Sequence, residues 1–422
     1  MDSGFAVMDR AGTDPKYAAG QEGWAAINCA SKRAYGCGKR GNSAVQDLDL
    51  LLYHGDLENL SSSLSVRAGD KMFRWIDQEI AAKGGMRAAP GEEDRYLRSK
   101  VEIVDKGLIV VTLSLSEYGG FDYYLVFDSV DSSLSMTPYI PDWATCYTTC
   151  PLPLRHDDGG GGGYSLVLFG GEFGFGREVD NKFLWQWSPL AGSWGRSSDP
   201  WQTKKLRFPT ELKGRFFSPD VLFSFDGFAF WTDLALGTLF CDSRTLLRGG
   251  YLVNFSFIKL PPGYQLDRDE DSWPVEVYRT MGCAGGSVKF VSIGGKPGTS
   301  RVEVWTLAPS RREWKLYSNF QLKNLRKDFR GAGLPNNLPM WPLLREQEGA
   351  TLYMILADNE TRTRDGGKKH YICGLDITTK SLLQSKLLSH TSLIQGPVIL
   401  PSVIIDYLEP LPSRLEPILM EV

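Results

Sequence analysis

The stretch Lys106–Leu115 reads KGLIVVTLSL, a short turn followed by an apolar run that is rich in β-branched residues. A run of this kind, bounded by turn residues, is typical of a buried β-strand. Four later stretches share its shape, namely Tyr164–Glu172, Gly227–Ala235, Gly286–Lys296 and Gly349–Asn359. The chain therefore repeats one strand-forming pattern along most of its length.

The spacing of these stretches is regular. Their aligned positions are Leu108, Ser165, Phe228, Val288 and Leu352, which lie 57, 63, 60 and 64 residues apart. Each stretch is followed by a second strand-like run and often by a third, with turn-forming residues between them. A unit of three or four antiparallel strands with a period of ~40–60 residues is typical of a propeller blade, because such a sheet buries its faces only against its neighbours.

We therefore predict an all-β protein, a β-propeller of about six blades, with seven blades as the alternative count. A sandwich, or two separate β domains, is the alternative fold. Residues 95–422 are predicted to form the propeller domain. Its sixth blade would combine the C-terminal run Val398–Leu408 with N-terminal strands near Val45–Tyr53.

Residues 1–94 are predicted to be a short irregular segment that is partly flexible and contributes strands to ring closure. The segment includes one possible helix, over Gly69–Ala82. Its apolar residues fall on one helical face, namely Met72, Phe73, Ile76 and Ile80.

Composition and charge exclude several classes of protein. The 47 Lys and Arg residues are balanced by 50 Asp and Glu residues, whereas nucleic-acid binders are normally basic. No apolar run approaches the ~20 residues of a membrane helix, and the first thirty residues lack the basic start and apolar run of a signal peptide. The seven cysteines are scattered, as in reduced proteins. We expect a protein of the cytoplasm, the nucleus or both.

Two features carry a resemblance to known repeats. The glycine pairs Gly170-Gly171 and Gly294-Gly295 resemble those that end a strand in kelch-type blades, where a positive φ is needed. The block Phe223–Ser243, FSFDGFAFWTDLALGTLFCDS, together with Phe121–Tyr139 and Tyr278–Gly294, resembles a plant family expanded in grasses, the domain of unknown function 1618 family.

This resemblance covers roughly residues 100–390. It implies an uncharacterised β-propeller that is distantly similar to the repeats associated with F-boxes, and the family has no assigned catalytic residues. An F-box itself is not found, because the nearest candidate, Asp47–Ser61, lacks the later Cys and Trp positions that the family pattern implies.

No stretch predicts a metal or a cofactor. Cys146, Cys150 and His156 would supply three ligands where a structural zinc site needs four. The acidic run Asp267–Asp271 lacks the Gly and Glu of a calcium loop, and Gly170–Gly176 does not have dinucleotide spacing.

Catalytic residues are not predicted either. The four histidines are expected to be exposed in loops, namely His54, His156, His370 and His390. In the family block that contains Trp231, we expect Asp233 and Asp242 to cap turns or to bond backbone amides across blades. The pairs Lys204-Lys205 and Arg311-Arg312 are too small to form a nucleic-acid patch.

These observations predict a noncatalytic protein-interaction module, scaffold- or adaptor-like, whose partners are other proteins and neither nucleic acid nor membrane. Loops on a rigid frame suit recognition, and Gln186–Lys205 and Asp358–Lys369 are candidate loops. The alternative is a propeller enzyme, such as a hydrolase with carboxylates at the channel mouth.

Overall fold

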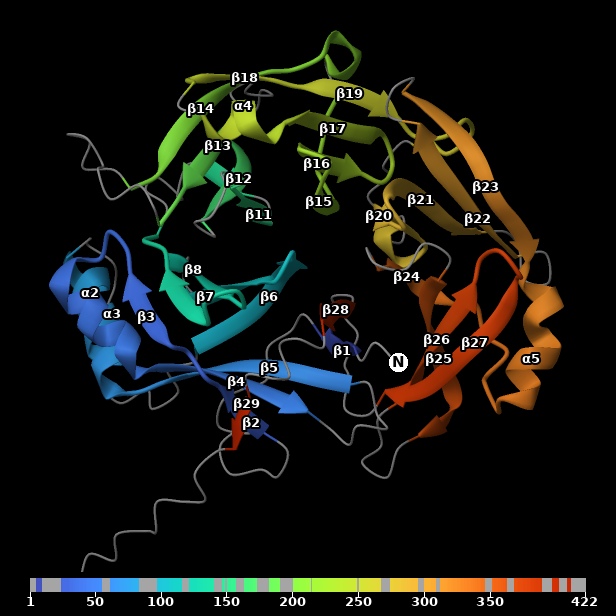
Figure 1. Cartoon of the computed structure of the whole chain (residues 1–422), viewed down its shortest axis with the longest axis horizontal. Helices are drawn as coiled ribbons and strands as arrows, with labels where there is room; N and C mark the ends of the chain where they lie inside the picture. The colour runs from blue at the N-terminus through green and yellow to red at the C-terminus, as the bar shows by residue number, and fades with distance from the viewer. Residues whose placement is uncertain are drawn as a thin grey trace, which may run out of the picture. The chain divides into compact units, whose positions relative to one another are not determined.

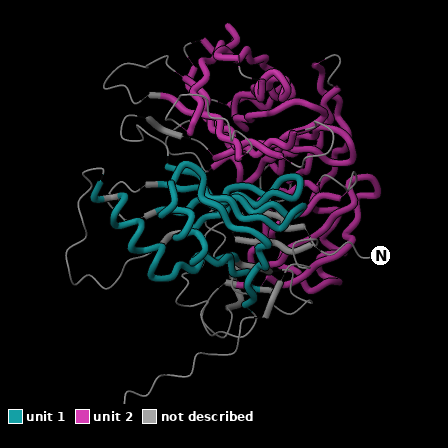
Figure 2. Tube along the Cα trace, turned by 60° about the vertical axis from the view of Figure 1, so that its left-hand side comes forward, with its two compact units in different colours: residues 1–140, 392–422 teal, residues 141–391 magenta. Residues whose placement is uncertain are grey.

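The structure is a computed structural model. The residues that it describes are 5–9, 24–54, 61–82, 97–115, 121–139, 146–148, 150–156, 163–172, 182–189, 200–213, 215–248, 250–266, 274–294, 300–308, 312–345, 351–362, 368–388, 397–401 and 408–410. The chain forms two compact units: Met1–Ile140 with Ser392–Val422 is unit 1, and Pro141–Thr391 is unit 2 (Figure 2). The domain division predicted at residue 94 stays a prediction.

Unit 1 contains two sheets. In spatial order the first has β28 (Pro397–Pro401), β1 (Phe5–Asp9), β5 (Ser61–Ala68), β4 (Leu48–His54), β2 (Trp24–Ile27) and β29 (Leu408–Pro410). The second has β3 (Ser31–Ala34), β9 (Ser133–Met136), β8 (Phe121–Asp128), β7 (Leu108–Leu115) and β6 (Leu97–Asp105). Strands from both ends of the chain thus share one sheet, as the sequence predicts for Val398–Leu408 and Val45–Tyr53.

Unit 2 contains four sheets (Figure 1). The first has β10 (Cys146–Thr148), β12 (Tyr164–Glu172), β13 (Lys182–Trp187), β14 (Gln202–Arg207) and β18 (Leu252–Asn254), with β11 (Leu152–Arg155) also paired to β12. The others are β15 (Val221–Phe225), β16 (Phe228–Asp233), β17 (Gly237–Asp242) and β19 (Ser256–Lys259); β20 (Arg279–Ala284), β21 (Ser287–Gly294), β22 (Arg301–Ala308) and β23 (Glu313–Gln321); and β24 (Met340–Leu344), β25 (Thr351–Arg362), β26 (Lys368–Asp376) and β27 (Ser381–Leu388).

Helices are few and short in the described part of the chain. The α-helices are α2 (Gly38–Ala44), α3 (Asp70–Ala82), α4 (Ser243–Leu247) and α5 (Arg326–Gly331). The 3-10 helices are η1 (Val45–Asp47), η2 (Thr210–Leu212), η3 (Val275–Val277) and η4 (Leu322–Leu325). The segment predicted to be irregular therefore contains the predicted helix, as α3, and also strands β1 to β5 and helix α2.

The repeated pattern has a simple structural cause. Each repeated stretch forms the second strand of a sheet, namely β7, β12, β16, β21 and β25. In three sheets a two-residue turn precedes it, and both turn residues have positive φ: Lys106 and Gly107, Asp226 and Gly227, Gly285 and Gly286. Positive φ at both positions is what a type I′ hairpin requires, and glycine at the second position allows it.

Burial on both faces explains why the strands read as continuous apolar runs. In β21, Val288 and Phe290 pack in a cluster with residues of the β15–β19 sheet, such as Phe230. Val291 packs in a different cluster, with residues of the β24–β27 sheet such as Leu356. A strand covered by a neighbour on each side shows little alternation between apolar and polar residues.

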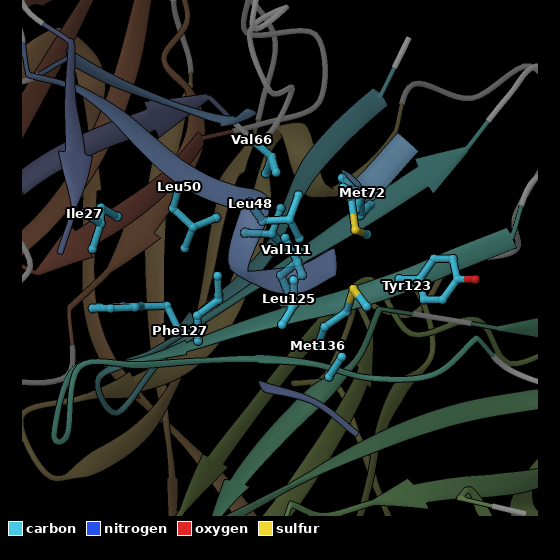
Figure 3. Close-up of a cluster of buried hydrophobic side chains, with 14 of the residues drawn as sticks. Ile27, Leu48, Leu50, Val66, Met72, Val111, Tyr123, Leu125, Phe127 and Met136 are labelled. Carbon is cyan, nitrogen blue, oxygen red and sulfur yellow. The ribbon is translucent and has the colours of Figure 1, made fainter. Parts of the chain in front are cut away.

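The core of unit 1 joins its two sheets and α3 (Figure 3). Leu50 from β4 and Val111 from β7 meet in it, and Met72 and Trp75 of α3 are buried there as well. Asp47 fixes the start of α3, since its carboxylate accepts a hydrogen bond from the Lys71 N–H at 2.9 Å.

The glycine pair Gly170-Gly171 lies directly before Glu172, the last residue of β12. Both residues lie inside β12, where they pair with Phe183 and Lys182 of β13. Residues 173–181 lie outside the described part of the chain, so the kelch-type resemblance of this pair stays a prediction. Gly294 ends β21, and Gly295 lies outside the described residues.

Candidate interaction surface

The turn between β16 and β17 is the most densely bonded feature of the family block. One oxygen of the Asp233 carboxylate accepts hydrogen bonds from the N–H groups of Ala235 (2.9 Å) and Leu236 (3.1 Å). The other oxygen accepts one from the N–H of Ser218 at 3.2 Å. Asp233 is buried, so these bonds replace the water that its carboxylate would otherwise hold. The predicted turn-bonding role of Asp233 is what the structure shows.

Two neighbouring segments are tied to this turn. The Asp220 carboxylate accepts the Leu234 N–H at 2.7 Å, and the Leu266 N–H donates to the Ala235 carbonyl at 2.9 Å. Arg279 of β20 donates through Nη1 to the carbonyls of Leu234 and Tyr264, each at 2.8 Å. Desolvation lowers the pKa of the Arg279 guanidinium, in keeping with its partly buried position.

Large apolar side chains are exposed beside this rigid turn. Phe216, two residues before Ser218, is 61% exposed, and Leu266 is 42% exposed. Phe217, by contrast, is fully buried and packs edge-on against Phe169, with ring centroids 6.2 Å apart. We call Phe216 and Leu266 the rim residues. The hydrogen bonds around Asp233 hold the backbone next to Phe216, through Ser218, and the backbone of Leu266 itself. The two exposed side chains therefore project from backbone that is fixed in place.

The other residues of the family block serve the fold. Asp242 caps α4, because its carboxylate accepts the Thr245 N–H at 2.6 Å. Trp231 is fully buried and lies edge-on to Phe255, with ring centroids 5.3 Å apart. The hydroxyls of Thr232 and Thr238 bond each other and face the sulfur of Met281, on the next sheet, at 3.5 and 3.4 Å.

The two lysines of the Lys204-Lys205 pair each have a structural partner. Lys204 is buried, and its Nζ donates to the carbonyls of Leu246 and Arg248 at the end of α4, the latter at 3.1 Å. Burial lowers the pKa of Lys204. Lys205 instead lies over the ring of Tyr251. The Lys204-Lys205 pair is therefore not a surface patch. Arg311 lies outside the described residues.

The residues considered for metals are not brought together. Within the described residues, no group of three or more His, Cys, Asp or Glu side chains is arranged to hold a metal ion. Cys146 lies in β10, and Cys150 precedes β11, where its thiol faces the Pro151 carbonyl oxygen at 3.8 Å. The acidic run Asp267–Asp271 and residues 173–176 of the glycine-rich stretch lie outside the described residues.

Two of the four histidines, His156 and His370, are not fully exposed as predicted. His370 lies in strand β26 and is half-buried, because the strand continues through it to pair with Leu388. His156 directly follows β11 and is half-buried, with Nε2 2.9 Å from the Ser165 Oγ. The side chain of His54 and the whole of His390 lie outside the description.

His156 and Ser165 form the pair that most resembles a nucleophile and its base. Ser165 is fully buried, however, and its Oγ offers no surface to a substrate. Four strands of unit 2, one from each sheet, contact one another in series: β11, β15, β20 and β24. These strands carry Arg155 and Arg279 but no carboxylate, so the carboxylates of a hydrolase would have to come from elsewhere.

Sequence reasoning missed the rim residues and the two partners of the turn, Asp220 and Arg279. Nothing in the sequence separates exposed Phe216 from buried Phe217. Asp220 carried a weak signal, since an aspartate directly before a strand often bonds a neighbouring amide.

The candidate loops Gln186–Lys205 and Asp358–Lys369 are only partly described. Their described parts are strand ends of β13, β14, β25 and β26, and residues 190–199 and 363–367 lie outside.

The six small, mostly antiparallel sheets found among the described residues define the class of the protein as a six-bladed β-propeller, which confirms the predicted fold. Residues 231–353 match the family described as "Protein of unknown function (DUF1618)". This segment runs from Trp231 in β16 to Tyr353 in β25 and includes the Asp233 turn and Arg279. This match confirms the resemblance to the family that the sequence predicts, over these residues.

No curated protein sequence matches the chain. Solved structures similar to it include dihydro-heme d1 dehydrogenase NirN, at 12% identity over 86% of this chain and 66% of that chain, with a TM-score of 0.31. The chain thus spans just under two thirds of NirN.

Two further similar structures belong to different kinds of protein. The WD40 domain of SCAP from fission yeast has 9% identity over 81% of this chain and 70% of that chain (TM-score 0.31). The α-L-arabinofuranosidase PaAbf62A from Podospora anserina has 11% identity over 69% and 94% (TM-score 0.31). At these scores the similarities carry no conclusion about function.

No helix in the described part of the chain is both long enough and apolar enough to cross a membrane.

Proposed function

We propose that the protein is a noncatalytic protein-interaction propeller, adaptor- or scaffold-like, that docks another protein on the rim residues Phe216 and Leu266. The observation that carries this proposal is the exposure of two large apolar side chains on segments held by a buried hydrogen-bond network. Apolar anchors on a rigid support lose little entropy on binding, and aromatic side chains such as that of Phe216 are enriched in protein interfaces.

The proposed partner is a protein, not nucleic acid or a membrane. A protein partner suits an apolar contact in a chain whose net charge is −3. The cysteines Cys29, Cys241 and Cys373 form no disulfide, which suits a reducing compartment. We therefore place the interaction in the cytoplasm or the nucleus, where a fluorescent fusion of the chain should be found.

Proximity labelling in cells tests the proposal. Replacing both rim residues, Phe216→Ser with Leu266→Ser, should reduce the recovery of the main partner by about tenfold, the effect of losing roughly 1.4 kcal/mol of binding energy. The matched control is Val130→Ser with Leu252→Ser, since these residues are 69% and 42% exposed at other places. The proposal fails when no partner is recovered reproducibly, or when both double variants lose the partner equally.

A propeller hydrolase is the second candidate, and the His156–Ser165 hydrogen bond is the observation that favours it. The full burial of Ser165 favours a structural role for the pair instead. Ester turnover distinguishes the two roles, because only a catalytic pair would hydrolyse an ester.

A further inference from the structure

A second surface of unit 2 differs in chemistry from the rim residues. The segment formed by η4 and α5 buries Leu322, Leu325 and Phe329, which pack in the core cluster shared by the β20–β23 and β24–β27 sheets. These residues recur at the three- and four-residue spacing of one helical face, so the intervening residues lie on the outside.

The outer face of this segment is cationic. Its exposed cations are Lys323, Arg326, Lys327 and Arg330, and none makes a side-chain hydrogen bond or an ion pair in the described part of the chain. Asp328 is the single carboxylate of the segment and is also exposed. The segment therefore carries a local excess of positive charge on a chain whose net charge is −3. We call these four cations the α5 cationic face.

The neighbouring strand extends this surface. α5 contacts β27, the edge strand of its sheet (Figure 1). β27 carries Lys386 and no carboxylate, and its Leu383 is 54% exposed. An acidic ligand on α5 would thus meet no negative charge on β27 that could repel it. It would also find an apolar side chain, Leu383, beside it.

We propose that the α5 cationic face binds a short acidic segment of a partner protein. Four cations over eight residues of helix span about 12 Å, which matches about four residues of an extended peptide. Exposed arginines suit carboxylates because their planar guanidinium groups can bind them bidentately. Nucleic acids fit less well, because their binding proteins commonly neutralise about 6–10 phosphates, and the rest of this chain would repel a long polyanion.

Fluorescence anisotropy with the full chain tests this proposal. The probe is a labelled peptide with four consecutive glutamates, and the reference is the same peptide with glutamines. The double variant Arg326→Gln with Arg330→Gln should weaken binding of the glutamate peptide by about tenfold. The control, Lys213→Gln with Lys259→Gln, removes the same amount of charge from exposed lysines of unit 2. It should change the affinity for the glutamate peptide by less than about twofold.

Each other outcome contradicts the proposal. Equal binding of the glutamate and glutamine peptides, or equal loss in the two double variants, would show that the face has no role. Stronger binding of single-stranded DNA or of phosphatidylserine vesicles that is lost in the same variant would assign the face to a different ligand. Should the first variant fail to fold, Lys323→Gln with Lys327→Gln replaces it. Phe216→Ser with Leu266→Ser should leave peptide binding intact, so this test and that of the proposed function can fail independently.

Discussion

Arg279 and Leu234 join two neighbouring sheets through a single hydrogen bond, in which Nη1 of Arg279 lies 2.8 Å from the carbonyl oxygen of Leu234. The same nitrogen reaches the carbonyl of Tyr264 at 2.8 Å, and the guanidinium stands over the ring of Tyr264. Arg279 begins β20, whereas Leu234 follows β16. One side chain therefore ties the Asp233 turn both to the next sheet and to the segment that leads to Leu266.

Replacing Arg279 should destabilise the protein. Arg279→Ala removes the one nitrogen that serves both carbonyl groups, and a hydrogen bond from a charged group contributes about 1.5–3 kcal/mol, so we expect a loss of about 2–3 kcal/mol in urea unfolding. Arg279→Lys keeps the charge but not the planar fork, and should recover only part of this stability. Arg215→Ala, at an exposed arginine near the same turn, is the control. Equal stability of the two alanine variants would contradict this structural role.

At Gly237 the backbone of β17 lies very close to β19. The φ of Gly237 is +153°, and a Cβ there would lie 2.4 Å from the Ile258 carbonyl oxygen and 2.6 Å from the Phe257 ring. Because the backbone of β19 cannot yield, we expect Gly237→Ala to lower the free energy of unfolding by about 2–4 kcal/mol. Gly294→Ala is the matched control, since a Cβ at Gly294 has open space. A thermal melt in which both variants equal the wild type would refute the close approach.

The repeat could be predicted from the sequence because two-sided burial and tight turns both leave local signals. Asp226 and Gly227 mark a hairpin, and Phe228–Asp233 follows as a buried strand, so the period of the blades shows directly. The first strands of the sheets were harder to recognise. β24 contains Trp341 with a φ of +51° and a proline, Pro342, so it lacks the alternation and residue preferences of a regular strand.

The candidate site was predictable only in part. Asp233 and Asp242 have local partners, two or three residues ahead, and aspartate at a turn predicts such bonds. Arg279 lies far along the chain from Leu234, and the exposure of Phe216 depends on which segments cover Phe217. Both depend on tertiary packing, which no local pattern in the sequence encodes.

The cap of α4 should make a small part of the stability depend on pH. Hydrogen bonding from the Thr245 N–H lowers the pKa of the Asp242 carboxyl. A folded-state pKa below the unfolded one means that the ionised cap stabilises the fold at pH values above the unfolded pKa, about 4, and loses this contribution as the pH falls through the folded pKa. Asp242→Ala should cost about 1 kcal/mol at neutral pH, and its difference from the wild type should vanish in acid.

Chemical denaturation at about pH 7, 5 and 3 measures this dependence. Glu313→Ala is the control, because Glu313 is exposed and makes no side-chain hydrogen bond or ion pair in the described residues. A difference between Asp242→Ala and the wild type that stays constant down to the lowest pH would contradict a role for the ionised carboxylate.

Substitution of His156 and Ser165 distinguishes the interaction-module hypothesis from the hydrolase hypothesis. Ser165 is fully buried, so we expect the wild-type protein to hydrolyse p-nitrophenyl acetate no faster than either Ser165→Ala or His156→Gln. A serine that acts as a nucleophile needs its base and an accessible oxygen, and removing either residue of a working pair typically lowers turnover by many orders of magnitude. The pair should instead contribute to stability, and Ser165→Ala should lower the free energy of unfolding by about 1 kcal/mol. Turnover that both substitutions abolish, in variants that still melt cooperatively, would assign the protein to the hydrolases.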